Sequence, residues 1–141
     1  MRIATFNINN INKRLTNLLA WLKATKPDVV CLQELKAADQ EFPQDALAKT
    51  GYNAVWRGQK SWNGVAILAR GRDPIVTRSE LPGDANDVQA RYVEVPVNGV
   101  LVASLYAPNA IRSLGRNSRT SLPGWTGLRC MRRICLPPVR R

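Results

Sequence analysis

Two short apolar segments near the start of the chain each end in a polar side chain. The first, residues 2–7, reaches Asn7, and the second is Pro27-Asp-Val-Val-Cys-Leu-Gln-Glu34. Short apolar runs of this kind indicate buried strands. Because ligands bind at the carboxyl ends of strands in open α/β sheets, Asn7 and Glu34 are expected side by side at one edge. A single carboxylate beside an amide is typical of a Mg²⁺ site, where water and substrate phosphates supply the other ligands.

The first 109 residues are predicted to alternate between strands and helices, the pattern of an α/β fold. Residues 15–24 show the apolar spacing of a helix, which Pro27 ends. Residues 29–32 form a continuous apolar run, suited to a strand that is buried on both faces. Asn98-Gly99 is a type I′ hairpin signal, so antiparallel strands are expected on either side of it within a mixed sheet. The other expected elements are a short helix at 45–49 and strands at 2–7, 53–57, 65–69, 75–78, 92–97 and 100–106.

A set of short motifs occurs in order between residue 1 and residue 109. The motifs are Phe6-Asn7-Ile8-Asn9, Leu32-Gln33-Glu34, Gly51-Tyr52, Gly58-Gln59-Lys60, Trp62-Asn63-Gly64-Val65-Ala66-Ile67-Leu68, Gln89-Ala90-Arg91-Tyr92 and Tyr106-Ala107-Pro108-Asn109. Each motif alone is weak, but the ordered set is specific. In this set the chain resembles the exodeoxyribonuclease III and AP endonuclease family of the endonuclease/exonuclease/phosphatase superfamily. The Gly-Gln-Lys and Trp-Asn-Gly-Val-Ala-Ile motifs, with Phe42-Pro43, favour the DNA-repair branch over the lipid-phosphatase and sphingomyelinase branches.

The resemblance implies the N-terminal half of a four-layer α/β sandwich with a mixed, largely antiparallel sheet. The family's fold consists of two similar halves, and 141 residues suffice for one of them. The later motifs of the family, a Gly-Asp-x-Asn loop, a further aspartate and a terminal Ser-Asp-His, are absent, and the chain has no histidine. An imidazole general base therefore cannot come from this chain.

For a complete protein, the resemblance implies a phosphodiester hydrolase that uses Mg²⁺, with Mn²⁺ as an alternative metal. The expected substrate is double-stranded DNA, which would be nicked 5′ to abasic sites and shortened from its 3′ ends. We expect a cytoplasmic protein with no membrane contact, since no signal peptide or transmembrane run is visible. The expected oligomeric state is a monomer. The 141-residue chain alone is expected to be inactive, because the groups that position and activate the attacking water are missing.

The resemblance also assigns roles to three side chains of the site. Glu34 is the expected Mg²⁺ ligand, although a structural salt bridge would also account for a carboxylate there. Asn7 is expected to act in both the metal site and catalysis by holding Glu34, with a turn cap as the alternative role. Tyr106 is expected to be catalytic by directing its hydroxyl at the scissile phosphate, with a half-buried edge aromatic as the alternative.

Asn109, Lys60 and Arg91 are the expected DNA-binding residues. Asn109 matches an asparagine that contacts DNA phosphate in some members of the family. Lys60 and Arg91 lie among aromatic residues and would contact phosphates, and the alternative for each is a charge on a solvated surface. Phosphate contacts position DNA without reading its sequence, which suits an enzyme that recognises damage or ends.

The composition changes abruptly after residue 109. Residues 110–141 contain eight arginines and no Lys, Asp or Glu, whereas all 10 acidic residues precede them. The net charge of +11 is therefore mostly a property of this tail. The tail could bind phosphates through its arginines, it could be a disordered segment of high net charge, or its sequence was never selected as protein.

Codon arithmetic favours the last interpretation. Asn109-Ala-Ile-Arg-Ser113 can be encoded so that one restored base after the first codon gives Asn-Gly-Asn-Pro-Gln, which is how this family commonly continues. The restored frame also turns residues 120–128 into an amphipathic helix, where the actual segment has Pro and Gly that break a helix. We therefore expect a truncated domain at 1–109 and a frameshifted, disordered tail at 110–141.

Two other functions stay open at this point. The half domain and its arginine tail could form a non-catalytic basic nucleic-acid-binding fragment, recognised by salt-dependent DNA binding without Mg²⁺-dependent cleavage. The chain could also be an unstable remnant without activity, because half of a sandwich exposes the face that packs on its partner. The sequence does not choose between these two functions.

Overall fold

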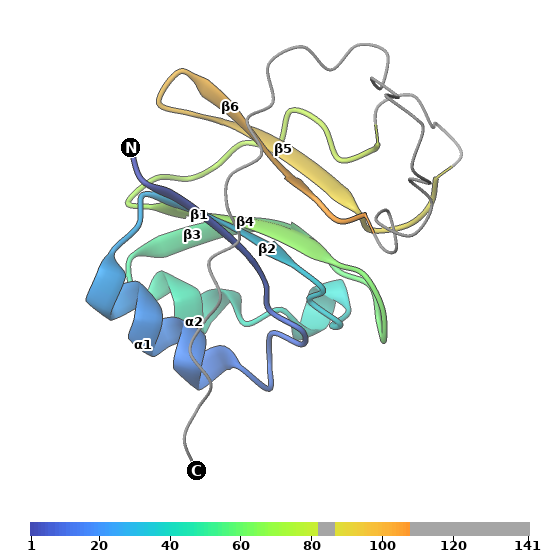
Figure 1. Cartoon of the computed structure of the whole chain (residues 1–141), viewed down its shortest axis with the longest axis horizontal. Coiled ribbons are helices and arrows are strands. Elements are labelled where there is room, and N and C mark those ends of the chain that lie inside the picture. Colours follow the sequence, from blue (N-terminus) through green and yellow to red (C-terminus); the bar gives the residue numbers. More distant parts are fainter. Residues whose placement is uncertain (82–86, 108–141) are drawn as a thin grey trace, which may run out of the picture.

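A computed structural model describes residues 1–81 and 87–107 as an α/β fold built in layers. Helices α1 and α2 cover one face of a four-stranded sheet, and a two-stranded hairpin covers the other (Figure 1). The elements are β1 (Ile3–Asn7), α1 (Leu15–Thr25), β2 (Val29–Gln33), the 3₁₀ turn η1 (Asp39–Glu41), α2 (Gln44–Ala48), β3 (Tyr52–Arg57), β4 (Val65–Arg70), β5 (Tyr92–Val97) and β6 (Val100–Leu105). None of the helices in these ranges has both the length and the apolar character that a membrane span requires.

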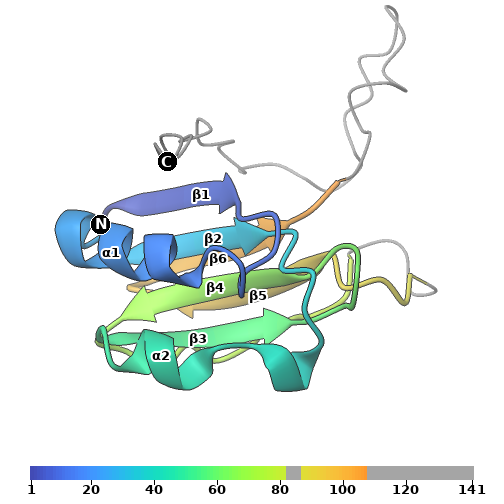
Figure 2. The ribbon, with the colours of Figure 1, turned by 90° about the horizontal axis from the view of Figure 1, so that it is seen from below.

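The carboxyl ends of three strands lie at the same end of the central sheet. Its strand order is β1-β2-β4-β3 (Figure 2). β1 and β2 are parallel, with Asn7 opposite Gln33, whereas β4 is antiparallel to both of its neighbours. The ends of β1, β2 and β3 and the start of β4 therefore lie together. The mixed, largely antiparallel sheet predicted from the sequence is confirmed.

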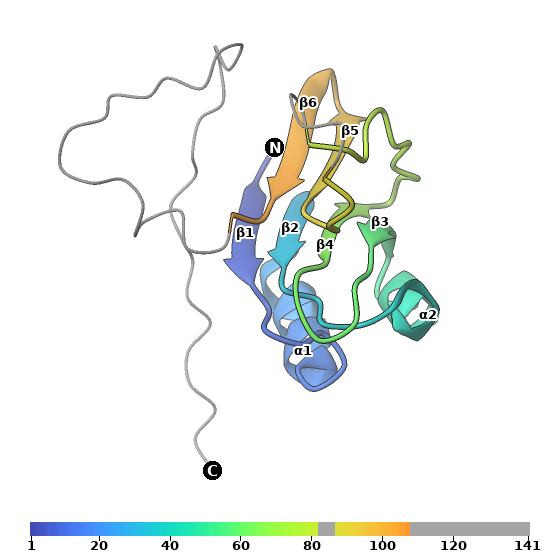
Figure 3. The same ribbon diagram turned by 90° about the vertical axis from the view of Figure 1, so that its right-hand side faces the viewer.

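Strand β2 lies between two hydrophobic cores. Val30 and Leu32 pack in the core that includes Leu18 of α1. Val29 and Cys31 pack in a second core with residues of the β5–β6 hairpin. Figure 3 shows this hairpin on the side of the central sheet away from α1. All residues of β2 except the last are buried. Burial on both faces explains why this strand is continuously apolar rather than alternating.

The predicted first helix and hairpin are confirmed, with small shifts at their ends. α1 ends at Thr25, and Lys26 then adopts a left-handed conformation before Pro27. Asn98 and Gly99 have φ values of 53° and 75°. Two positive φ values are what a type I′ turn requires, and this turn joins the antiparallel strands β5 and β6.

The strand predicted at residues 75–78 is wrong. Within the described residues, this segment makes a single bridge, between Arg78 and Glu94. Ile75 and Val76 are 74% and 43% exposed. Strand propensity depends on packing against neighbours on a pleated surface, and these two β-branched side chains lack it.

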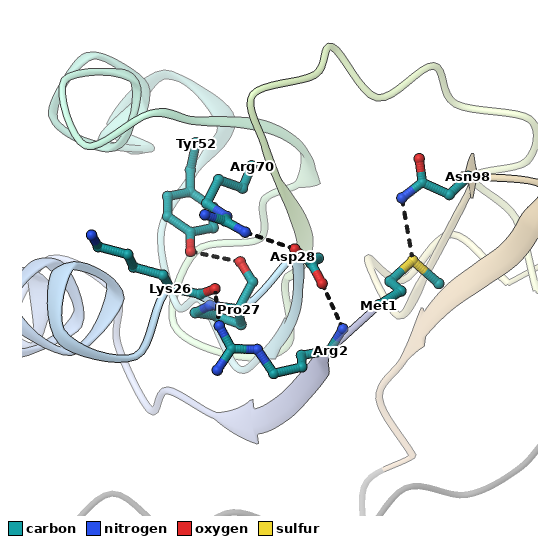
Figure 4. A network of polar contacts seen from close by, with 8 residues as sticks. All are labelled: Met1, Arg2, Lys26, Pro27, Asp28, Tyr52, Arg70 and Asn98. Atoms are coloured by element: carbon teal, nitrogen blue, oxygen red, sulfur yellow. Dashed lines mark hydrogen bonds and ion pairs between the residues drawn. The ribbon is translucent and has the colours of Figure 1, made fainter.

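A network of polar contacts centred on Asp28 joins the strands at the opposite end of the sheet (Figure 4). The Asp28 carboxylate accepts a hydrogen bond from the backbone N of Arg2 over 2.6 Å and pairs with the Arg70 guanidinium at 2.8 Å. The Tyr52 hydroxyl donates to the carbonyl of Pro27 over 2.7 Å. These contacts join the start of β1, β2 and β3 to the end of β4, at the far end from Asn7 and Glu34.

Candidate active site

Asn7 and Glu34 lie side by side at the carboxyl ends of β1 and β2. The amide Nδ2 of Asn7 donates to Glu34 Oε1 over 2.6 Å. Beyond the strands, Ile8 N donates to Gln33 O and Asn10 N donates to Glu34 O, each over 2.9 Å. The parallel pairing of the two strands thus continues into the loops. This backbone pairing sets the distance between the two side chains.

Tyr106 reaches the same carboxylate from the other sheet. It directly follows β6, and its hydroxyl donates to Glu34 Oε1 over 2.9 Å. Its backbone N donates to Arg91 O over 2.9 Å, so the pairing of the hairpin continues one residue past β6. The structure therefore brings together the three residues that the sequence assigned to the chemistry of the site.

Lys36 is a fourth member of this group, which the sequence analysis missed. Its Nζ lies 3.1 Å from Glu34 Oε2 and donates to Asn9 Oδ1 over 2.7 Å. Asn9 in turn donates its backbone N–H to Asn7 Oδ1 over 2.9 Å. The one signal in the sequence was the position of Lys36, two residues after a candidate metal ligand.

The backbone around Glu34 is strained. Glu34 and Lys36 have φ values of 55° and 50°, in the left-handed region that side chains of this size rarely adopt. Leu35 between them is fully buried, and its backbone N donates to Gly64 O over 3.1 Å. Each residue in such a conformation costs of the order of 1–3 kcal/mol. The packing of Leu35 therefore holds the partly buried Glu34 carboxylate in one arrangement.

The surroundings of Glu34 favour its ionised form. Burial alone would raise the pKa of this carboxyl, but hydrogen bonds from Asn7, Tyr106 and Lys36 together lower the pKa below its usual value. The pKa of Tyr106 is raised, first by burial and then by its hydrogen bond to Glu34. The site thus presents an ionised carboxylate beside a phenol that keeps its proton.

The oxygen atoms that Glu34 and Asn7 offer as ligands fit a weakly held, hard divalent cation. Glu34 supplies one carboxylate, and Asn7 Oδ1 keeps one lone pair after accepting from Asn9 N. Groups of three or more His, Cys, Asp or Glu side chains are absent from the residues that the structure describes. This arrangement suits a cation of the Mg²⁺ type, which keeps several waters. It does not suit structural zinc, which takes four protein ligands.

The three predicted DNA contacts lie in different places. Lys60 is exposed in the loop between β3 and β4. This loop lies at the same end of the sheet as the carboxyl end of β2, which Glu34 follows (Figure 2). Arg91 directly precedes β5, and its Nε is buried without a hydrogen-bond partner in the described ranges. Asn109 lies outside the described residues. The DNA-binding roles of these residues stay predictions.

Comparison with known proteins finds the same family along most of the chain. Residues 4–132 match the Endonuclease/Exonuclease/phosphatase family. The chain is 39% identical to exodeoxyribonuclease III of Haemophilus influenzae over 93 residues, which are 66% of this chain and 34% of the relative. A solved 3′-5′ exonuclease from Neisseria meningitidis superposes with a TM-score of 0.72 at 40% identity, covering 77% of this chain and 42% of that one. An AP endonuclease from Archaeoglobus fulgidus gives a TM-score of 0.71 at 36% identity, with coverage of 77% and 42%.

Fold and site together define a layered α/β protein with one carboxylate at the carboxyl edge of a mixed sheet. The chain belongs to the Endonuclease/Exonuclease/phosphatase family. The resemblance to exodeoxyribonuclease III and AP endonucleases is confirmed by the relatives that it matches. The chain spans 34% of the length of the curated relative and 42% of each of the two structures.

Proposed function

We propose that this chain carries part of the active site of a Mg²⁺-dependent DNA-repair nuclease of the exodeoxyribonuclease III type. The observation that carries the proposal is the convergence of Asn7 and Tyr106 on one oxygen of Glu34, over 2.6 and 2.9 Å. The names of the matched exodeoxyribonuclease and AP endonuclease support DNA as the substrate. Duplex DNA with abasic sites or 3′ ends would be the target.

Each residue of the site has a distinct role in this proposal. Glu34 would hold the metal, while Asn7 keeps the carboxylate oriented through its amide. Mg²⁺ bound there supplies positive charge that stabilises the charge developing on the phosphoryl oxygens. Tyr106 provides a hydroxyl donor beside Glu34 for a substrate phosphate oxygen. Lys36 and Lys60 add positive charge that attracts the phosphate backbone.

The chain supplies no imidazole to this reaction, because it has no histidine. A general base of that type has to come from another polypeptide segment. We therefore expect the 141-residue chain by itself to bind the metal without cleaving DNA above background. Mg²⁺-dependent nicking by this chain alone, lost on Glu34→Ala, would contradict that part of the proposal.

A chimera tests the proposed activity directly. Residues 1–107 are joined to the C-terminal portion of the Haemophilus influenzae exodeoxyribonuclease III and assayed on a duplex with one abasic site. We expect Mg²⁺-dependent nicking that falls by about 100-fold or more on Glu34→Ala, since a metal ligand is removed. A folded chimera that nicks equally well with Glu34→Ala would remove Glu34 from the site.

A second function, non-catalytic nucleic-acid binding, is favoured by the charge of residues 110–141. Eight arginines without an acidic residue can neutralise several phosphates, which makes affinity strongly salt-dependent. The test compares the full chain with a chain ending at residue 109 on duplex DNA without Mg²⁺. If this segment binds DNA, the affinity of the full chain should fall more steeply with salt concentration. Equal slopes would exclude DNA binding by this segment.

The domain boundary after residue 109 and the frameshift stay predictions. The gene sequence past codon 109 tests both.

A further inference from the structure

Three amide side chains form a hydrogen-bonded group that we call the amide cluster: Gln59, Asn63 and Gln89. Asn63 Nδ2 donates to Gln59 Oε1 over 3.0 Å and to Gln89 Oε1 over 2.7 Å. Gln59 Nε2 donates to the same Gln89 oxygen over 2.8 Å. Asn63 is 7% exposed and is one of two buried polar residues in the described part of the chain. The cluster is therefore a closed set of polar groups near the protein interior.

One backbone group fixes the direction of every hydrogen bond in the amide cluster. Ala90 N donates to Gln59 Oε1 over 3.0 Å. Because a backbone N–H can only donate, Gln59 has to present its oxygen there and its Nε2 to Gln89. Asn63 then has to donate to both glutamines. Reversing any one of the three amides would set like groups against each other.

The backbone of Asn63 and Gly64, beside the amide cluster, joins two separate segments to the loop between β3 and β4. Asn63 O accepts from Lys36 N over 3.2 Å, and Gly64 O accepts from Leu35 N over 3.1 Å. On the other side, Gly64 N donates to Ala90 O over 2.9 Å. The approach is close, because a Cβ at Gly64 would lie 2.8 Å from the Leu35 Cβ. The loop after β2 and the segment before β5 are thus held in one arrangement.

These two segments are the ones that carry Glu34 and Tyr106 into contact. Leu35 and Lys36 directly follow Glu34 in the chain. Arg91 directly follows Ala90, and its carbonyl accepts from Tyr106 N over 2.9 Å. The hydrogen bond between Tyr106 and Glu34 therefore joins two parts of the chain that the backbone of Asn63 and Gly64 also joins. The amide cluster holds this backbone to the segment before β5 through Gln89 and Ala90.

We infer that Gln59, Asn63 and Gln89 are positioning residues that set the placement of Glu34 relative to Tyr106. They would act through the backbone of the two segments and would not touch the substrate. The inference rests on the proposed function, because the placement concerned is that of a metal and phosphate site. Residues that orient metal ligands without contacting the metal typically change metal affinity by about 10–100-fold when they are mutated.

Two substitutions of equal size and charge separate positioning from general electrostatics. Gln89→Glu keeps the oxygen that accepts both hydrogen bonds, so the amide cluster is retained. Gln59→Glu replaces the donor Nε2 with an oxygen and sets two acceptors against each other, where the present atoms are 2.8 Å apart. Both changes add one negative charge within the same cluster, so their long-range effects on a bound cation are closely matched.

The probe is Mg²⁺ alone, titrated into the ¹⁵N-labelled 141-residue chain and followed by the amide NMR signals of Glu34, Lys36 and Tyr106. We expect Gln59→Glu to weaken Mg²⁺ affinity about tenfold and to displace these signals in the metal-free protein. Gln89→Glu should leave the affinity within about twofold of the unmodified chain, because the positioning is intact. Equal Mg²⁺ affinities in the two variants would overturn the inference.

A third variant keeps the test decisive if Gln59→Glu does not fold. Gln89→Met removes the shared acceptor without changing the charge, and it should weaken Mg²⁺ binding as Gln59→Glu does. Unchanged Mg²⁺ affinity in a folded Gln89→Met chain would contradict the inference. If the unmodified chain does not bind Mg²⁺ through Glu34, the proposed function fails. The amide NMR signals of Glu34, Lys36 and Tyr106 in the metal-free protein then decide the inference alone.

Displacement of these signals in Gln59→Glu and not in Gln89→Glu supports the inference. Any other pattern of displacement overturns it.

Discussion

The hydroxyl of Tyr106 donates to Oε1 of Glu34 over 2.9 Å, although the two residues are 72 positions apart and follow strands of different sheets. The same oxygen accepts from the Asn7 amide over 2.6 Å. A carboxylate between two donors keeps its orientation before any substrate arrives. The β5–β6 hairpin, which packs on the central sheet, therefore helps to build the site as well as the core.

Tyr106→Phe removes the hydroxyl and keeps the aromatic ring. In the chimera described above, we expect kcat to fall by about 100-fold with little change in KM, because a donor to developing charge is lost. Tyr92→Phe is the matched control, since its hydroxyl donates to Glu94 over 2.6 Å on the same hairpin. Steady-state kinetics on an abasic-site duplex measure both variants. Equal losses in the two would indicate a loosened hairpin and no specific role for the Tyr106 hydroxyl.

Asp28 makes the stability of the fold depend on pH in the acid range. The backbone N–H of Arg2 and the Arg70 side chain lower the pKa of Asp28 below its usual value. A carboxyl with a lower pKa in the folded state stabilises the fold above the unfolded pKa of about 3.9, and this contribution is lost as the pH falls through the folded pKa. Asp28→Asn should therefore lower Tm at neutral pH and flatten the fall of Tm in acid. Calorimetry that gave parallel curves for the two chains would rule out this role.

Gly58 lies too close to the backbone of the neighbouring loop to accept a side chain. A Cβ there would lie 2.6 Å from Ala37 O and 2.7 Å from Asp39 N. We expect Gly58→Ala to lower the free energy of unfolding by about 1–3 kcal/mol, because the backbone has to shift. Urea denaturation provides the measurement. The same stability as the unmodified chain would mean that the loop moves aside without cost.

Cys31 should be chemically inert while the chain is folded. Burial raises the pKa of its thiol to about 12, and the side chain is 5% exposed. Since the thiolate is the reactive form, iodoacetamide at neutral pH should leave Cys31 unmodified in buffer and alkylate it in urea. Mass spectrometry of the peptide that contains Cys31 distinguishes these results. Rapid alkylation in buffer would show that the core between the two sheets opens readily.

The elements that depend on local sequence could be predicted from it. Residues 29–32 are continuously apolar because both faces of β2 are covered, and Asn98-Gly99 forms the turn that its two positive φ values allow. The segment at 75–78 misled the prediction, because its apolar side chains meet no core face. Strand-forming composition alone does not reveal whether such a face exists.

The pairing of Asn7 with Glu34 was predictable because they lie at the carboxyl ends of parallel strands that are neighbours in the sheet. Lys36 was not, because it reaches Glu34 through a backbone with φ of 50° that no sequence pattern indicates. The contacts of Asn63 with Gln89 depend on how the β3–β4 loop packs against the segment before β5. Contacts between distant loops depend on tertiary packing, which cannot be read from the sequence.

The central claim, that Glu34 is the metal ligand of this site, is tested most directly by titrating Mg²⁺ into the chain and into Glu34→Gln. Binding is followed by the amide NMR signals of residues 7, 34 and 36. We predict weak, saturable binding in the unmodified chain, because one carboxylate leaves most of the coordination to water. Asp45→Asn, at an exposed carboxylate of α2, is the control and should bind as the unmodified chain does. Abolished binding in Glu34→Gln is the predicted result, and an unchanged Mg²⁺ affinity in that variant would contradict the claim.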